Sequence, residues 1–208
     1  MKKQALLWMK CTILTVVALT IMLCGAWPAK AMIITYTDQA TGSGMLGTTA
    51  FTGALVTVTL TGDTTNVVSV SSTYANPVGT ATVSVSGIGT GTFSNQMQAF
   101  VNQTSSPAAV GISQVITIPF GVSVLDTLNA AFSTYDLTTS IGPISGSPFI
   151  NSGTTFDTTL GSFSLTSVGN STFTATTRTT SAVPVPSTML LLGSGLIGLA
   201  GWRRKFKK

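Results

Sequence analysis

The sequence predicts an all-β ectodomain, an antiparallel β-sandwich of the jelly-roll or immunoglobulin-like kind, between an N-terminal signal-peptide helix and a short C-terminal transmembrane helix. Ser and Thr supply 54 of the 155 residues from 32 to 186, and with Val and Gly they favour strands and turns over helices. Apolar and hydroxyl side chains alternate with period two in many short segments. Nine of the ten basic residues lie in the first 31 or the last six positions, which is typical of topology signals.

Charge and composition exclude several classes of protein. The chain has no histidine and two cysteines, which excludes Ser-His-Asp and Cys-His catalysis, histidine-ligated metals and zinc ribbons. Its formal charge is +5, but residues 32–186 hold only Arg178 against five Asp, a net charge of −4. Because nucleic-acid binding needs Lys and Arg on the folded surface, we expect no nucleic-acid partner.

Residues 1–31 are predicted to be a secretory signal peptide. Three lysines in the first ten residues precede an apolar run from 11 to 26, and Ala29 and Ala31 stand at the small-residue positions before a cut. A permanent membrane anchor is the alternative, although the run is shorter than the roughly 20 residues of a span. A lipoprotein cut before Cys24 is disfavoured by Leu23. Cleavage after Ala31 would remove both cysteines, which suits an oxidising compartment.

Residues 32–182 form the predicted ectodomain. Large apolar residues recur along it, which favours a folded domain over a mucin-like stalk, and about 150 residues can close a two-sheet core. A helical turn is expected within 126–137, and GIGTG at 87–91 is expected to be a hairpin turn. Period-two alternation predicts strands at 54–62, 80–89, 113–125, 162–168 and 171–177.

The ectodomain offers few groups for chemistry, and we predict no catalytic residue, cofactor or metal ligand. Asp63, Asp126 and Asp136 are expected in turns. A secreted hydrolase would need two Asp that face each other across a cleft. A calcium site would need Asp residues from distant parts of the chain to meet in the fold, because the sequence has no DxDxDG run. A carbohydrate-binding module would place exposed aromatics beside an Asp. The aromatic candidates are Tyr36, Tyr74, Tyr135 and Phe149.

The carboxyl end has three consecutive parts. Pro184 and Pro186, with Val185 between them, keep the chain extended. A short transmembrane helix follows at 188–202, in which Gly195, Gly198 and Gly201 form a face that another membrane helix can approach closely. A basic tail at 203–208 is expected to stay in the cytoplasm. Its charged residues are Arg203, Arg204, Lys205, Lys207 and Lys208.

An ordinary membrane anchor would account for residues 183–208, but their order resembles the PEP-CTERM sorting signal of exported bacterial proteins. Val185 stands where that family has Glu. The resemblance implies processing by an exosortase, an inner-membrane-anchored precursor in a Gram-negative bacterium, and a final place on the cell surface or outside the cell. It also implies association with exopolysaccharide or biofilm. We therefore expect a structural or adhesive surface protein, with a carbohydrate-binding module as the alternative and a secreted hydrolase as a third reading.

Overall fold

The computed structural model describes residues 32–179, and this part of the chain is built almost entirely of antiparallel strands. The elements in chain order are β1 (Met32–Leu46), β2 (Thr49–Asp63), η1 (Thr64–Asn66), β3 (Val68–Val70), β4 (Thr73–Asn76), β5 (Gly79–Val85), β6 (Gly89–Thr92), β7 (Met97–Asn102), β8 (Ala109–Thr117), β9 (Phe120–Leu128), η2 (Ala130–Thr134), β10 (Ile141–Phe149), β11 (Thr155–Thr158) and β12 (Gly161–Thr179). The predicted all-β, antiparallel class is confirmed.

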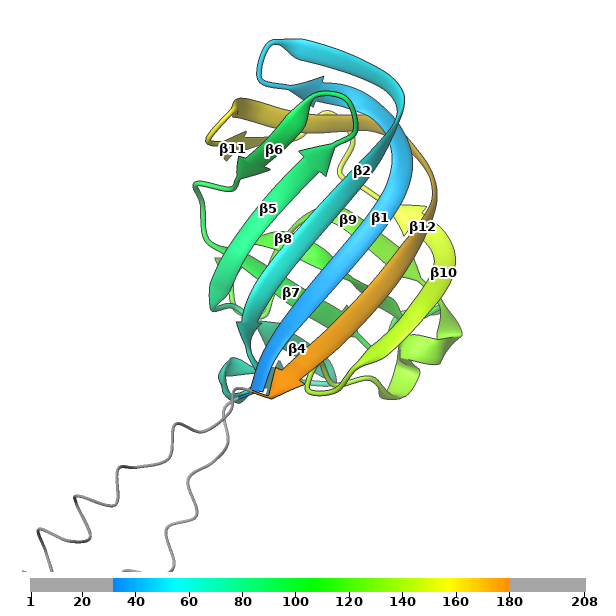
Figure 1. Cartoon of the computed structure of the whole chain (residues 1–208). Coiled ribbons are helices and arrows are strands. Elements are labelled where there is room, and N and C mark those ends of the chain that lie inside the picture. The colour runs from blue at the N-terminus through cyan, green and yellow to red at the C-terminus, as the bar shows by residue number, and fades with distance from the viewer. Residues whose placement is uncertain (1–31, 180–208) are drawn as a thin grey trace, which may run out of the picture. The chain divides into compact units, whose positions relative to one another are not determined.

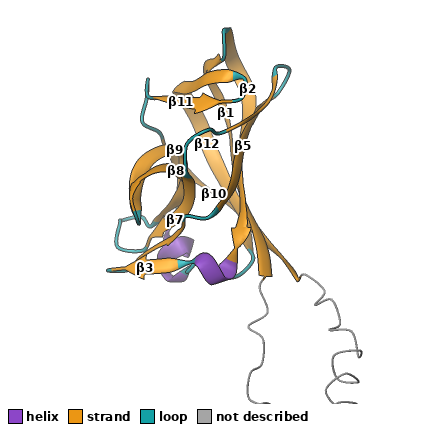
Figure 2. Ribbon diagram, turned by 90° about the vertical axis from the view of Figure 1, so that its left-hand side faces the viewer, coloured by secondary structure: helices purple, strands orange, loops and turns teal. Residues whose placement is uncertain are grey.

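The strands form one curled sheet of 12 strands, and two of its regions face each other. Its order is β3-β4-β7-β8-β9-β10-β12-β1-β2-β5-β6, with β11 paired to β12. Figure 1 shows β12, β1, β2 and β5 crossing in front of β7, β8 and β9. The predicted sandwich differs in one respect, because β10 pairs with β12 through residues 141–146 and with β9 through residues 147–149. The two layers are therefore continuous through β10 (Figure 2).

The core lies between the two layers and follows the predicted alternation. Val56, Val58 and Leu60 of β2 are fully buried, while the threonines between them are only partly buried. Phe173 of β12 is also fully buried, and its ring contacts three aromatic rings at centroid distances of 5.8–6.4 Å, those of Tyr36, Phe132 and Tyr135. Phe132 comes from η2, so this aromatic cluster fixes the short helix against the sheet.

Several of the predicted strand segments have wrong boundaries. The segment 113–125 is a hairpin of two strands, because Pro119 has no N–H for a ladder and Thr117 pairs with Phe120 across the turn. The segments 162–168 and 171–177 belong to the single strand β12. Gly169 and Asn170, expected to end a strand, instead form a bulge, since β1 pairs Ala40 with Ser171 but Gly42 with Val168. The predicted strand 80–89 ends at Val85, where the expected hairpin is confirmed, but its turn lies at 86–88 and β6 begins at Gly89.

Candidate functional site

The residues that the sequence singled out for export and sorting all lie outside the described part of the chain. They are Ala29 and Ala31; Pro184, Val185 and Pro186; Gly195, Gly198 and Gly201; and Arg203, Arg204, Lys205, Lys207 and Lys208. The predicted signal peptide, 1–31, and the predicted transmembrane helix, 188–202, lie outside it as well. Within residues 32–179, no helix is long and apolar enough to cross a membrane.

The two ends of the described domain lie side by side. Met32 opens β1 and pairs with Thr179, the last residue of β12 (Figure 1). The two strands stay paired along their length, from Met32–Thr179 to Leu46–Phe163. The sheet therefore brings the position that follows the predicted signal-peptide cut next to the position that precedes the predicted sorting segment. A segment attached at either end joins the same point of the domain.

Two of the five aspartates cap turns, as predicted. Asp63 Oδ1 accepts hydrogen bonds from Thr65 N at 2.8 Å and Thr65 Oγ1 at 2.7 Å, which lower the pKa of its exposed carboxyl. Asp136 Oδ1 accepts equivalent bonds from the amide and hydroxyl of Thr138. Asp157 lies exposed on β11. These three carboxylates have local roles or face solvent.

Asp38 and Asp126 are buried inside strands, and for Asp126 the predicted turn is wrong. Asp126 lies within β9 and pairs with Gly111 of β8. Gly111 makes room for it, because a Cβ at that position would lie 2.3 Å from Asp126 Oδ1. Burial raises the pKa of both carboxyls well above the usual range, and the nearby charge of Asp126 raises the pKa of Asp38 further. Both carboxyls are therefore held toward their neutral form.

The hydrogen bonds around Asp38 form a chain of buried polar side chains that a neutral carboxyl can complete. Asp38 Oδ1 lies 2.8 Å from Thr127 Oγ1, which lies 2.8 Å from Ser171 Oγ, and the Ser171 hydroxyl donates to the carbonyl oxygen of Asp126 at 3.1 Å. These three contacts need three protons, and the two hydroxyls supply two. A neutral Asp38 carboxyl, which its raised pKa favours, can supply the third by donating to Thr127, so that Thr127 can donate to Ser171. We call these side chains the Asp38 chain.

The two buried aspartates do not form the cleft that a hydrolase needs. The Asp38 chain lies between the two layers, whereas alternation along β9 puts Asp126 on the face opposite Thr127. There the Ser123 hydroxyl donates to Asp126 Oδ2 at 2.6 Å. Among residues 32–179, no three His, Cys, Asp or Glu lie close enough together to hold a metal ion.

The tyrosines do not form the exposed aromatic platform considered for sugar binding. Tyr36 is fully buried and Tyr135 is 4 % exposed, which weakens that arrangement. The Tyr36 hydroxyl donates to the carbonyl oxygen of Leu137 at 2.7 Å and accepts from Asn76 Nδ2 at 3.1 Å. Leu137 has a positive φ of 66°, which is unfavourable for a branched residue. Tyr36 therefore holds a strained segment in place.

Removing the Tyr36 hydroxyl should destabilise the domain. Tyr36→Phe leaves the buried Leu137 carbonyl without its donor, and we expect the free energy of unfolding to fall by about 1–3 kcal/mol. Tyr74→Phe is the matched control, because the Tyr74 hydroxyl makes no hydrogen bond within residues 32–179 and the side chain is half-buried. Urea unfolding followed by tyrosine fluorescence or circular dichroism measures both. Equal losses in the two variants would contradict this role.

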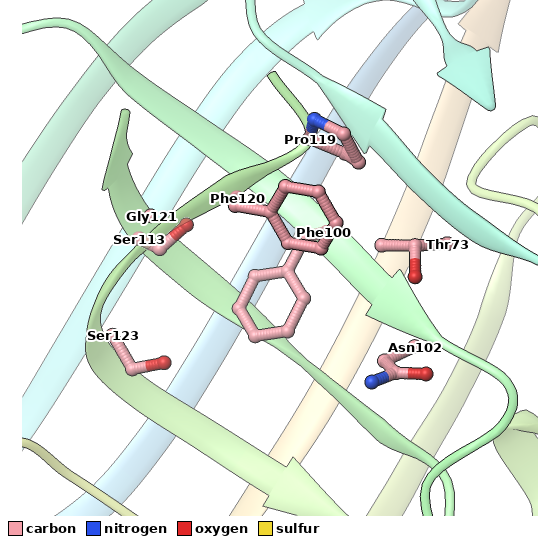
Figure 3. Close-up of a pocket in the computed structure, with 8 residues that line it drawn as sticks. All are labelled: Thr73, Phe100, Asn102, Ser113, Pro119, Phe120, Gly121 and Ser123. Atoms are coloured by element: carbon pink, nitrogen blue, oxygen red, sulfur yellow. The ribbon is translucent and has the colours of Figure 1, made fainter. Parts of the chain in front are cut away.

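A small open pocket lies on the outer face of β7, β8 and β9. Its volume is about 130 Å³. Its lining comes from four strands and the β8–β9 turn (Figure 3): Thr73, Phe100, Asn102, Ser113, Pro119, Phe120, Gly121 and Ser123. The lining contains no titratable side chain, and Asp126 lies directly behind it through its bond to Ser123. None of these residues was predicted from the sequence to form a site. Phe100 and Phe120 are 20 positions apart in the chain, and only the pairing of β7, β8 and β9 brings them together.

Comparison with known proteins identifies the segment after the β-domain. The description of the family model that matches residues 182–205 is "PEP-CTERM protein-sorting motif". No curated protein and no solved structure matches the chain significantly. The molecule is thus an all-β domain followed by a sorting segment, and that segment is a PEP-CTERM motif. The motif makes this an exported protein with an exosortase as its processing partner.

Proposed function

We propose that this protein is a structural or adhesive component of an exopolysaccharide or biofilm layer on a Gram-negative cell. In this proposal, residues 188–202 hold the precursor in the inner membrane until an exosortase cuts the motif and the β-domain passes to the surface or the medium. One observation carries the proposal. The sorting motif begins at residue 182, three positions after β12 ends at Thr179. Export and sorting through this motif would therefore carry the whole described domain with it.

The position of β12 supports a load-bearing role. β12 has 19 residues and pairs with β1, β10 and β11. A matrix attachment made beyond Thr179 would pull on a strand in the interior of the sheet. Strands held on both sides resist such a pull better than an edge strand, because more hydrogen bonds must break together.

The surface of the domain supports an extracellular, non-enzymatic role. Residues 32–179 carry three exposed or turn-capping Asp and one Arg, while the other two Asp are buried. A surface made mainly of Thr and Ser hydroxyls changes little with pH or salt and offers many hydrogen-bond donors and acceptors to water and sugars. We propose that the protein is not an enzyme, which agrees with a pocket lined by uncharged groups.

A carbohydrate-binding module remains the second candidate function. The observation that favours it is the pocket itself, in which Phe100 and Phe120 stand beside uncharged hydroxyl and amide groups. The two candidates are compatible, because an adhesive matrix protein can hold its matrix through a sugar site.

The intact mass of the surface-exposed protein tests the sorting mechanism. With an exosortase present, we expect a species that begins at Met32 and lacks Trp202 and the basic tail. Pro184→Ala with Pro186→Ala should leave at least tenfold more uncut, membrane-held precursor, because the chain entering the membrane loses its fixed extended form. Measurement is by mass spectrometry and by fractionation of cells and medium.

Val185→Glu is the matched control for that experiment. It restores the family's Glu between the same prolines, so we expect processing at least as complete as in the wild type. A surface-exposed species that keeps Trp202 and Lys208 would overturn the sorting mechanism. A mature species that begins at Met1 would overturn the signal peptide.

A further inference from the structure

The pocket on β7, β8 and β9 combines an aromatic face with unused polar groups. Phe120 is 61 % exposed, and the Phe100 ring lies next to it (Figure 3). The C–H faces of sugar rings pack against such rings while their hydroxyls bond at the edges. Thr73, Asn102, Ser113 and Ser123 stand around the two rings. This combination suits a ligand that is apolar on one face and rich in hydroxyls at its rim.

The polar groups of the pocket keep bonding capacity for a ligand. Asn102 Oδ1 is used by the amide and hydroxyl of Thr104, whereas Asn102 Nδ2 makes no hydrogen bond within residues 32–179. Ser113 Oγ accepts from Gln98 Nε2, so its own proton is free to be donated. Ser123 donates to Asp126 Oδ2, so its oxygen is free to accept. Asn102 thus offers a donor at the rim, while the buried Ser113 and Ser123 keep a donor and an acceptor at the floor of the pocket.

The aromatic face is held in place before any ligand arrives. Gln98 is fully buried, and its Nε2 donates to the carbonyl oxygen of Pro119 at 2.7 Å. This bond ties the β8–β9 turn, with Phe120 directly after it, to β7. An aromatic ring fixed in this way loses little conformational entropy on binding.

The size and charge of the pocket indicate which hydroxyl-rich ligand it fits. A dry cavity of about 150 Å³ accommodates one benzene ring, so about 130 Å³ is room for one six-membered ring. No cationic side chain lines the pocket, and the only base of residues 32–179 is Arg178, in β12. An anionic sugar would therefore find no counter-charge in the pocket.

We propose that this pocket binds one neutral hexopyranose unit of a polysaccharide. The ring packs on Phe120 and Phe100, and its hydroxyls bond to Asn102 Nδ2 and to the hydroxyls of Ser113 and Ser123. The inference deepens the proposed function by naming a site and a ligand class, and it rests on that function for the place where the protein meets polysaccharide.

Calorimetric titration of the exported protein tests the site. The probes are cellohexaose, laminarihexaose and mannohexaose, with hexagalacturonate as the acidic comparison. We expect at least one neutral hexasaccharide to bind. Phe120→Ala should weaken that binding about tenfold or more, the loss of one packed aromatic face. Asn102→Asp keeps the Oδ1 acceptor that Thr104 uses but removes the Nδ2 donor, and it should weaken binding several-fold.

Phe149→Ala is the matched control. Phe149 is 48 % exposed on β10 and does not line the pocket, so binding should stay within twofold of the wild type. The proposal is overturned if no neutral hexasaccharide binds, if Phe120→Ala binds as the wild type does, or if hexagalacturonate binds equally well. Since the mass measurement reports export and processing separately, failure of the sugar site is distinguishable from failure of the sorting mechanism.

Discussion

Phe173→Ala is expected to lower the free energy of unfolding by roughly 3–5 kcal/mol, the usual cost of removing a buried aromatic ring. Phe173 is fully buried, and its ring packs nearly parallel to Tyr36 and edge-on to Phe132. Domains of this size are stable by only about 5–15 kcal/mol. We therefore expect a large loss of folded protein at moderate temperature, measured by urea or thermal unfolding.

The position of Phe173 adds a second, local effect. The Phe173 ring of β12 packs against the ring of Phe132, which is the buried residue of η2. Without it, amide hydrogen exchange should rise first in residues 130–137. Phe149→Ala serves again as the control, because an exposed ring costs about 0.5 kcal/mol or less. A loss below about 1 kcal/mol for Phe173→Ala would contradict the packing described here.

The sequence predicted this part of the fold well, for a physical reason. Where one face of a strand is buried, period-two alternation marks that face residue by residue. Val56, Val58, Leu60 and Phe173 are apolar members of such alternations, and all four are fully buried. The alternation also predicted an all-β fold, because few long segments could form an amphipathic helix.

Period-two alternation did not predict features that differ from a strand with one buried and one exposed face. Asp126 was expected in a turn because Asp is a common turn residue, yet the glycine at position 111 on the next strand leaves space for a buried carboxyl there. The Asp38 chain joins residues 89 positions apart, and no local pattern encodes that distance. The joining of the two layers by β10 was also missed, since it depends on a change of partner within one strand.

The sorting segment was predictable because its motif is a consecutive stretch of sequence. Pro184 and Pro186, the apolar run and the basic cluster are recognised in order along the chain, without help from tertiary contacts, and the family match at residues 182–205 agrees with them. The pocket is the opposite case. Phe100, Phe120 and Asn102 carry no common sequence pattern, so only strand pairing could bring them together.

Asp38→Asn is expected to make the domain more stable at neutral pH and to flatten its dependence on pH. The pKa of Asp38 is raised by burial in the folded state, whereas an unfolded Asp titrates near 3.9. Above about pH 4 the unfolded chain therefore releases a proton that the folded domain keeps. The free energy of unfolding falls as pH rises, by about 1.4 kcal/mol per pH unit for each such carboxyl.

Asp126 follows the same rule, so two carboxyls contribute to the slope in the wild type. Above about pH 5, where the unfolded aspartates are almost fully ionised, we expect roughly 3 kcal/mol per pH unit, twice the slope for one group. Stability is highest below about pH 4 as far as these two groups are concerned. It is lost as pH rises toward their folded-state pKa values. Asp38→Asn should remove about half of the slope, which denaturant unfolding between pH 4 and pH 7 measures.

The amide also fits the hydrogen bonds that a neutral Asp38 would make. An Asn side chain can turn its Nδ2 toward Thr127 Oγ1 and donate, as the neutral carboxyl does, so Thr127 can still donate to Ser171. Thr127→Val is the opposing test, because it keeps the shape but removes the hydroxyl that bonds to Asp38, at a cost of about 1–3 kcal/mol, while Ser171 keeps its bond to the carbonyl oxygen of Asp126. If Asp38 were ionised in the folded domain, Asp38→Asn would destabilise the protein at pH 7 and leave the slope unchanged. Stabilisation by Asp38→Asn together with destabilisation by Thr127→Val would place the proton on Asp38.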